Sequence, residues 1–152
     1  MRSRAFIWRW AISSIIALAV VVLAALPPFV TEPLRTGLME AFAGLCHQMP
    51  DRSPHLDGVS LAICHRCLGI YGGVLGGVLA GPFTGRWTPP VSVGVLLVGA
   101  LAVPSLDWLG HVGGLWVNTP VSRVVTGGVL GLVVGWVVVQ SLIRPGTAQA
   151  EQ

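Results

Sequence analysis

The sequence predicts an all-α polytopic membrane protein with four transmembrane helices and one short amphipathic helix at the membrane interface. Of its 152 residues, 53% are hydrophobic and only 10% are charged, whereas a soluble domain carries about 25% charged residues. The apolar residues also gather into four stretches, and a membrane crossing needs roughly 20 such residues. The chain is too poor in charge to cover a water-facing surface, so we expect residues 1–152 to form a single membrane domain.

The predicted spans cover about residues 10–29, 61–83, 91–109 and 121–143. Arginines precede the first span as they precede a signal peptide, but its apolar stretch exceeds the about 7–15 residues typical of such a segment. An uncleaved helix is therefore favoured. The second span is short unless it begins near Leu61, which would place its cysteines at the membrane edge or just inside it.

The interfacial helix is expected over about residues 32–46, between the first two spans. Thr31 is suited to cap it and Pro33 to occupy its first turn. Apolar residues recur at helical spacing along it: Leu34, Leu38, Phe42 and Leu45. One apolar face with charges on the others is typical of a helix that lies in the plane of the interface.

Two spans carry glycine at every fourth position. The second has Gly69, Gly73, Gly77 and Gly81, and the fourth has Gly127, Gly131 and Gly135. Small residues at this spacing let two helix backbones approach closely in lipid, as in GxxxG packing. We expect these two spans to form the packed pair, whereas the first span, which lacks glycine, faces lipid.

Arginine placement predicts the orientation. Five arginines fall on the side of the two termini, namely Arg2, Arg4, Arg9, Arg86 and Arg144, and the four on the other side are accompanied by five acidic residues. Both termini are therefore expected in the cytoplasm, with the chain in the cell inner (plasma) membrane. The net charge of +3 includes no long basic run, which argues against a nucleic-acid partner.

All three cysteines lie within 22 positions, at Cys46, Cys64 and Cys67. Two cysteines separated by two residues form a clamp that brings two thiolates to one ion. Cys46 and one imidazole would complete a Cys₃His set, for which His47 is preferred and Asp51, His55 or His111 are substitutes. Tetrahedral sulfur and nitrogen ligands favour zinc first and iron second.

Several interpretations of the cysteines stay open. A structural metal site is favoured over a catalytic one, in which an open metal position would activate water with Asp51, Asp107 or His111 as catalytic candidates. A thiol–disulfide oxidoreductase would use Cys64 and Cys67 with Cys46 as exchange partner. The third hypothesis is a non-catalytic subunit of a larger membrane complex, and the weakest interpretation is buried cysteines without a shared role. Covalent haem c is excluded because Leu68 follows the second cysteine of the pair.

A polar pocket is predicted beside the cysteines. Arg66 and Arg123 lie near the starts of two parallel spans, whose N-terminal ends carry partial positive charge. With Asn118 they would bind an anionic headgroup or a quinone-like ring. Asp107 would join this pocket, or it would form an ion pair with Arg66 or Arg123 that fixes the helix register. Beyond the lipid bilayer, the candidate partners are another membrane protein and a second copy of the chain.

Two blocks of residues resemble a known family. The first is Cys46-His47-Gln48 with Pro50, Arg52 and Ser53, followed by Cys64-x-Arg66-Cys67-x-Gly69; the second is Asp107, Asn118 and Arg123-x-x-Thr126-Gly127. Over roughly residues 40–140 they are similar to the small prokaryotic membrane proteins of domain of unknown function 2085. The resemblance implies four membrane helices with a polar end and supplies no reaction. His111 stands where the family pattern leads us to expect glutamine.

Overall fold

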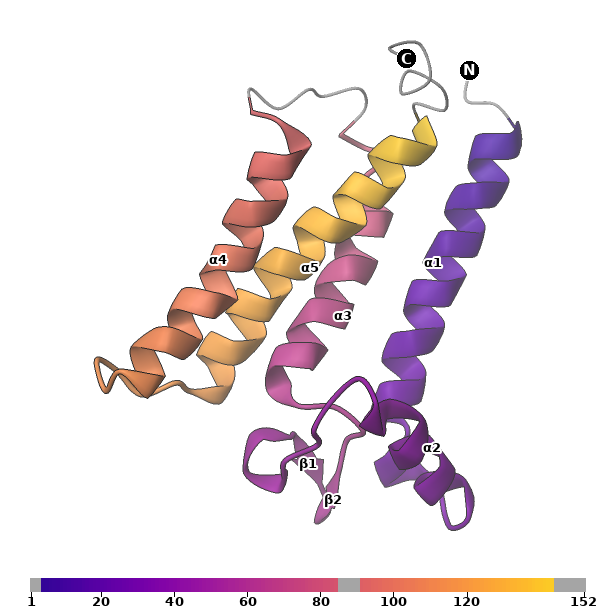
Figure 1. Cartoon of the computed structure of the whole chain (residues 1–152). Coiled ribbons are helices and arrows are strands. Elements are labelled where there is room, and N and C mark those ends of the chain that lie inside the picture. Colours follow the sequence, from indigo (N-terminus) through magenta and orange to yellow (C-terminus); the bar gives the residue numbers. More distant parts are fainter. Residues whose placement is uncertain (1–3, 85–90, 144–152) are drawn as a thin grey trace.

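The computed structural model describes residues 4–84 and 91–143 and is mostly helical (Figure 1). Its helices are α1 (Arg4–Ala25), α2 (Leu34–Ala43), α3 (His65–Ala80), α4 (Val93–Val112) and α5 (Pro120–Ile143). Two short 3₁₀ turns, η1 (Pro27–Phe29) and η2 (Pro50–Arg52), and a hairpin of β1 (His55–Leu56) with β2 (Val59–Ser60) complete the described elements.

Three of the described helices are long and apolar enough to cross a membrane: α1, α4 and α5. Helix α3 has only 16 residues, because it begins at His65 and ends at Ala80 instead of filling the predicted range 61–83. The prediction of membrane helices is therefore confirmed for three elements, and the fourth crossing stays a prediction. The predicted orientation rests partly on Arg2, Arg86 and Arg144, which lie outside the described residues.

Helices α3 and α5 run side by side, with α1 next to α3 and α4 next to α5 (Figure 1). Both α3 and α5 begin at the end of the bundle where α2 and the hairpin lie. The turn between α4 and α5 is at the same end. The first residues of two helices and the last residues of a third thus lie at the same end of the bundle as the loop that precedes α3.

The α3–α5 contact brings backbone against backbone. A Cβ atom added at Gly73 would lie 2.4 Å from the carbonyl oxygen of Gly128, and one added at Gly131 would lie 2.1 Å from that of Ile70. Gly69, Gly77, Gly127 and Gly135 are equally crowded by backbone atoms of the facing helix. No side chain larger than hydrogen fits at these positions without moving a helix.

Helix α1 contributes few buried side chains. Phe6 packs with Val78 and Val139, and the Trp10 indole donates a hydrogen bond of 2.9 Å to the Val78 carbonyl. Most other apolar side chains of α1 are exposed, as expected of a helix whose partner is lipid. Helix α4 exposes a similar set of apolar residues.

Helix α2 is shorter than the predicted 32–46. It begins after Pro33, and the Glu32 carboxylate, not Thr31, accepts hydrogen bonds from the backbone N–H and the hydroxyl of Thr36. These bonds lower the pKa of Glu32. The inner face of α2 places Phe42 in a small core with Ala24, Cys46, Ala62 and Ile63, so this helix packs on the end of the bundle.

The hairpin was not predicted. Asp57 and Gly58 both have positive φ, at 50° and 78°, and they connect the two paired strands. Asp-Gly between two extended residues is a known signal for a tight hairpin turn. The strands are only two residues long, so the alternating apolar pattern that usually marks a strand has no room to develop.

Candidate metal centre and adjoining polar cluster

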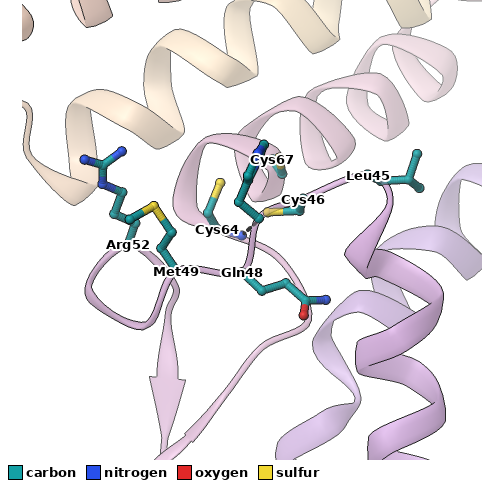
Figure 2. A pocket seen from close by; sticks show the side chains of 8 residues that line it. Leu45, Cys46, Gln48, Met49, Arg52, Cys64 and Cys67 are labelled. Atoms are coloured by element: carbon teal, nitrogen blue, oxygen red, sulfur yellow. Dashed lines mark hydrogen bonds between the residues drawn. The ribbon is translucent and has the colours of Figure 1, made fainter.

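Three thiols meet at the end of the bundle. The sulfur atoms of Cys46, Cys64 and Cys67 all lie within 4.8 Å of one another (Figure 2). Cys46 comes from the loop after α2, Cys64 directly precedes α3, and Cys67 lies in the first turn of α3. Fixing Cys64 and Cys67 on one helical turn explains their closeness, whereas Cys46 is brought in by the fold from 18 residues away.

Hydrogen bonds hold the Cys46 loop against the start of α3. The Cys64 backbone N–H donates to the Cys46 sulfur at 3.2 Å. The Gln48 side-chain amide donates to the carbonyl of Met39 at 2.7 Å and to that of Ala62 at 2.9 Å. Because Met39 is in α2 and Ala62 precedes α3, Gln48 links both flanks of the loop and fixes where Cys46 lies.

A cavity of about 320 Å³ opens beside the sulfurs. His47 lines it, but its imidazole is not among the three ligand atoms within 4.8 Å. Asp51 and His55 are exposed and do not line it. The Nδ1 atom of His65 lies 2.6 Å from the Arg52 carbonyl oxygen, which gives that ring a role in holding the loop.

The surroundings of Cys64 favour its thiolate. Its pKa is lowered, chiefly by a hydrogen bond from the Cys67 thiol and further by backbone amides of the first turn of α3 and by the Cys46 thiol. Burial acts in the opposite direction and is outweighed. A thiolate at the start of a helix also gains from the helix dipole, and the thiolate is the form that binds a metal.

A network of charged and amide side chains joins three helices and begins at Arg66, the residue directly before Cys67. Arg66 of α3 pairs with Asp107 of α4, with Nη2 and Oδ2 3.0 Å apart. Asn118 donates to the Asp107 carboxylate and accepts from Arg123 Nε of α5. Asp107 and Asn118 are 9% and 5% exposed. The four predicted pocket residues Arg66, Asp107, Asn118 and Arg123 are thus brought together, and we call them the polar cluster.

Two further residues lie close to the polar cluster in the sequence. Thr119 caps α5, because its hydroxyl accepts a hydrogen bond from the Ser122 backbone N–H at 3.1 Å. His111 is in the last turn of α4, and its ring nitrogen Nδ1 lies 3.4 Å from the Asn118 backbone nitrogen in the loop before α5. It does not join the group of thiols.

Gln48 is the site residue that spacing alone did not reveal. An amide in a cysteine-rich loop has no local pattern to mark it, because its two acceptors are distant carbonyls. Its position directly after Cys46-His47, within the first block of the family resemblance, is the one signal in the sequence that points to it.

Comparisons with known proteins agree with the membrane assignment. Residues 46–137, more than half of the chain, match the family described as "Predicted membrane protein (DUF2085)". The chain is 49% identical over 37 residues to "Uncharacterized protein MJ1492" of Methanocaldococcus jannaschii, and this match covers 24% of each protein. It thus spans about a quarter of that relative. No solved structure matches the chain. The matched residues include all three cysteines and the whole polar cluster, and the chain belongs to the DUF2085 family of predicted membrane proteins.

Proposed function

We propose that this protein is a small membrane protein that binds one metal ion, zinc before iron, through Cys46, Cys64, Cys67 and His47. The observation that carries the proposal is the convergence of three sulfur atoms within 4.8 Å. In a tetrahedral site, two sulfurs bound at about 2.3 Å to one zinc lie about 3.8 Å apart, so the thiols have to approach one another by about 1 Å at most. His47 lines the same cavity and directly follows Cys46, whereas His65, which directly follows Cys64, does not line it and contacts the Arg52 carbonyl.

The role we propose for the metal is structural. Cys46 is only 5% exposed, and its loop is already tied to α2 and to the start of α3 by Gln48. A metal shared by Cys46 and the Cys64/Cys67 pair would staple this loop onto α3 and hold the adjoining polar cluster in place. A closed four-ligand site of this kind is typical of structural zinc.

A thiol–disulfide oxidoreductase is the second candidate, because three free thiols lie within 4.8 Å of one another, with Cys46 placed to exchange with the Cys64/Cys67 pair, and the lowered pKa of Cys64 suits an attacking thiol. In that case Cys64 would attack a partner disulfide, and Cys67 would resolve the mixed disulfide. This alternative predicts a protein without metal and a mixed disulfide that accumulates in a Cys67→Ser variant.

We further propose that α3 is a short fourth crossing. Its glycines and those of α5 would pack backbone to backbone in the membrane, in the manner of GxxxG helices. The whole chain would then form one domain in the inner membrane. Both termini would lie in the cytoplasm, and the cysteines would lie at the opposite face.

Elemental analysis of protein purified in detergent under reducing conditions tests the metal proposal. We expect about one zinc per chain for the unaltered protein and close to none for Cys64→Ser. His55→Ala is the matched control and should keep its zinc, because His55 does not line the cavity. A protein that holds no metal under these conditions would refute the proposal, and a disulfide found by intact mass in a parallel preparation without reductant would favour thiol exchange.

A further inference from the structure

The polar cluster carries more positive than negative charge. It contains two guanidinium groups, on Arg66 and Arg123, and one carboxylate, on Asp107. Within residues 4–84 and 91–143, the Arg66–Asp107 pair is the only ion pair. A net cationic charge that is partly withdrawn from water is costly without a counter-ion.

The Arg66 side chain also has one hydrogen-bond donor without a partner. Its Nη2 contacts Asp107, whereas its Nε–H is buried and has no hydrogen-bond partner. Buried donors are nearly always satisfied in native proteins. An anion beside the Arg66 guanidinium would offset the surplus charge, and a shift of the side chain toward it would also give Nε–H an acceptor.

Arg66 lines a groove of about 470 Å³ between α3, α4 and α5. Apart from Arg66 and Ser105, its wall is apolar and includes Ile70, Leu101, Trp108 and Leu130. Leu101 and Trp108 are 56% and 47% exposed on a helix apolar enough to cross a membrane. The groove therefore opens toward lipid, with its single cationic group near the end of the bundle.

From this arrangement we infer that the groove binds one anionic phospholipid. The phosphate would accept hydrogen bonds from Arg66 near the membrane surface, and an acyl chain would lie along Leu101 and Leu130. Trp108 suits the interfacial level, where aromatic rings are enriched. A neutral ring would leave the surplus charge uncompensated, and a free anion would leave the apolar wall without a partner. The inference rests on α4 crossing the membrane and not on the metal.

The test measures the thermal stability of delipidated protein in neutral detergent during titration with phosphatidylglycerol, phosphatidylcholine or inorganic phosphate. A ligand that binds only the folded state raises the unfolding temperature. We expect phosphatidylglycerol to raise it and the other two to leave it unchanged. Native mass spectrometry should find one phosphatidylglycerol bound per chain.

Two variants with a matched control locate the site. Ser105→Trp fills the groove and should abolish the stabilisation, whereas Leu106→Trp, on the adjacent exposed position outside the groove, should keep it. Arg66→Gln should weaken phosphatidylglycerol binding about fivefold, the effect of one interfacial cation. Arg66→Gln also breaks an ion pair and therefore risks unfolding the protein. If Arg66→Gln does not fold, Ser105→Trp alone tests whether the lipid binds in the groove.

Three results would overturn the inference. Equal stabilisation by phosphatidylcholine would mean that the headgroup charge is not recognised. Stabilisation by inorganic phosphate alone would identify a free-anion site. An unchanged phosphatidylglycerol response in Ser105→Trp would place the lipid elsewhere. Each result leaves the zinc content of the protein as a separate measurement, so the two proposals fail independently.

Discussion

His47 and His55 lie in the same segment before α3 but differ in their relation to the sulfurs. His47 lines the cavity beside Cys46, Cys64 and Cys67, whereas His55 begins the hairpin and does not line it. This difference makes the pair a direct test of the fourth ligand.

We expect His47→Ala to reduce zinc affinity by at least about tenfold, the loss that follows even from removing an outer-shell partner. Competition with a chromophoric chelator measures the change, and His55→Ala should match the unaltered protein. Equal affinities for the two variants would show that His47 is not a ligand and would leave three thiols with a water or another donor.

Asp107 is the single carboxylate of the polar cluster and also the acceptor for Asn118. Asp107→Asn keeps the shape but removes the charge that offsets Arg66. We expect a loss of roughly 3 kcal/mol in the free energy of unfolding, as for a broken buried pair. Thermal unfolding in detergent measures it as a lower midpoint.

The control for Asp107→Asn is Asp51→Asn, because Asp51 is exposed and forms no ion pair in the described part of the chain. It should stay within about 0.5 kcal/mol of the unaltered protein. A similar midpoint for both variants would mean that the Arg66–Asp107 contact adds nothing to stability.

The polar cluster illustrates how far single residues can be predicted. Helical spacing placed Arg66 and Arg123 at the starts of parallel helices, and the arrangement in space agrees. Spacing left open which arginine pairs with Asp107. The choice of Arg66 depends on how α4 lies against α3 and α5, and Asn118 occupies the place between Asp107 and Arg123. Which side chain pairs with Asp107 is decided by the packing of the helices, and the residues near it in a single sequence do not reveal that packing.

At the scale of elements, the α3–α5 contact depends on which face of a helix a glycine occupies. Gly73 and Gly72 are neighbours in α3, yet a Cβ at Gly73 would lie 2.4 Å from the Gly128 carbonyl oxygen, and one at Gly72 would meet nothing within 4 Å. The two positions share their helix, their flanks and their residue type, so they isolate the effect of close approach.

Gly73→Ala should therefore destabilise the protein by about 1–3 kcal/mol, the typical cost of overpacking, because a backbone has to move. Gly72→Ala should be neutral or stabilising by up to about 1 kcal/mol, since alanine favours helix. Thermal unfolding of both variants provides the comparison. Equal effects would argue that the glycines have no packing role.

The sequence predicted well those elements whose pattern of apolar residues or glycines extends over several helical turns. The apolar stretches of α1, α4 and α5 and the four-residue glycine spacing extend over several turns, so local irregularities average out. The hairpin and the ends of α2 and α3 were missed or misplaced, because each is decided by a few residues. Asp57-Gly58 was a usable signal for the hairpin, whereas the start of α3 at His65 depends on the loop hydrogen bonds around Cys64.

At the scale of the whole molecule, orientation is the feature that one experiment can decide. The chain contains no lysine, so a single introduced lysine offers one new amine for a membrane-impermeant reagent. We expect Asp57→Lys, in the hairpin turn, to be labelled in intact cells. Gln152→Lys, at the C-terminal end, should be labelled only after the membrane is opened.

Peptide mass spectrometry distinguishes the introduced lysine from the N-terminal amine. Labelling of Gln152→Lys in intact cells, with Asp57→Lys protected, would reverse the proposed orientation. Labelling of both would mean an even number of crossings between them, as expected if α4 and α5 span the bilayer and α3 does not.

The length of α3 has a mechanical consequence for the surrounding bilayer. Sixteen residues rise about 24 Å, whereas the hydrocarbon region of a bilayer is about 30 Å thick. If α3 is a crossing, either the bilayer thins locally around it or its cysteine end lies below the level of the lipid headgroups. An ion would then reach the three sulfurs through a local depression of the membrane surface. Thinner bilayers would accommodate the protein with less distortion.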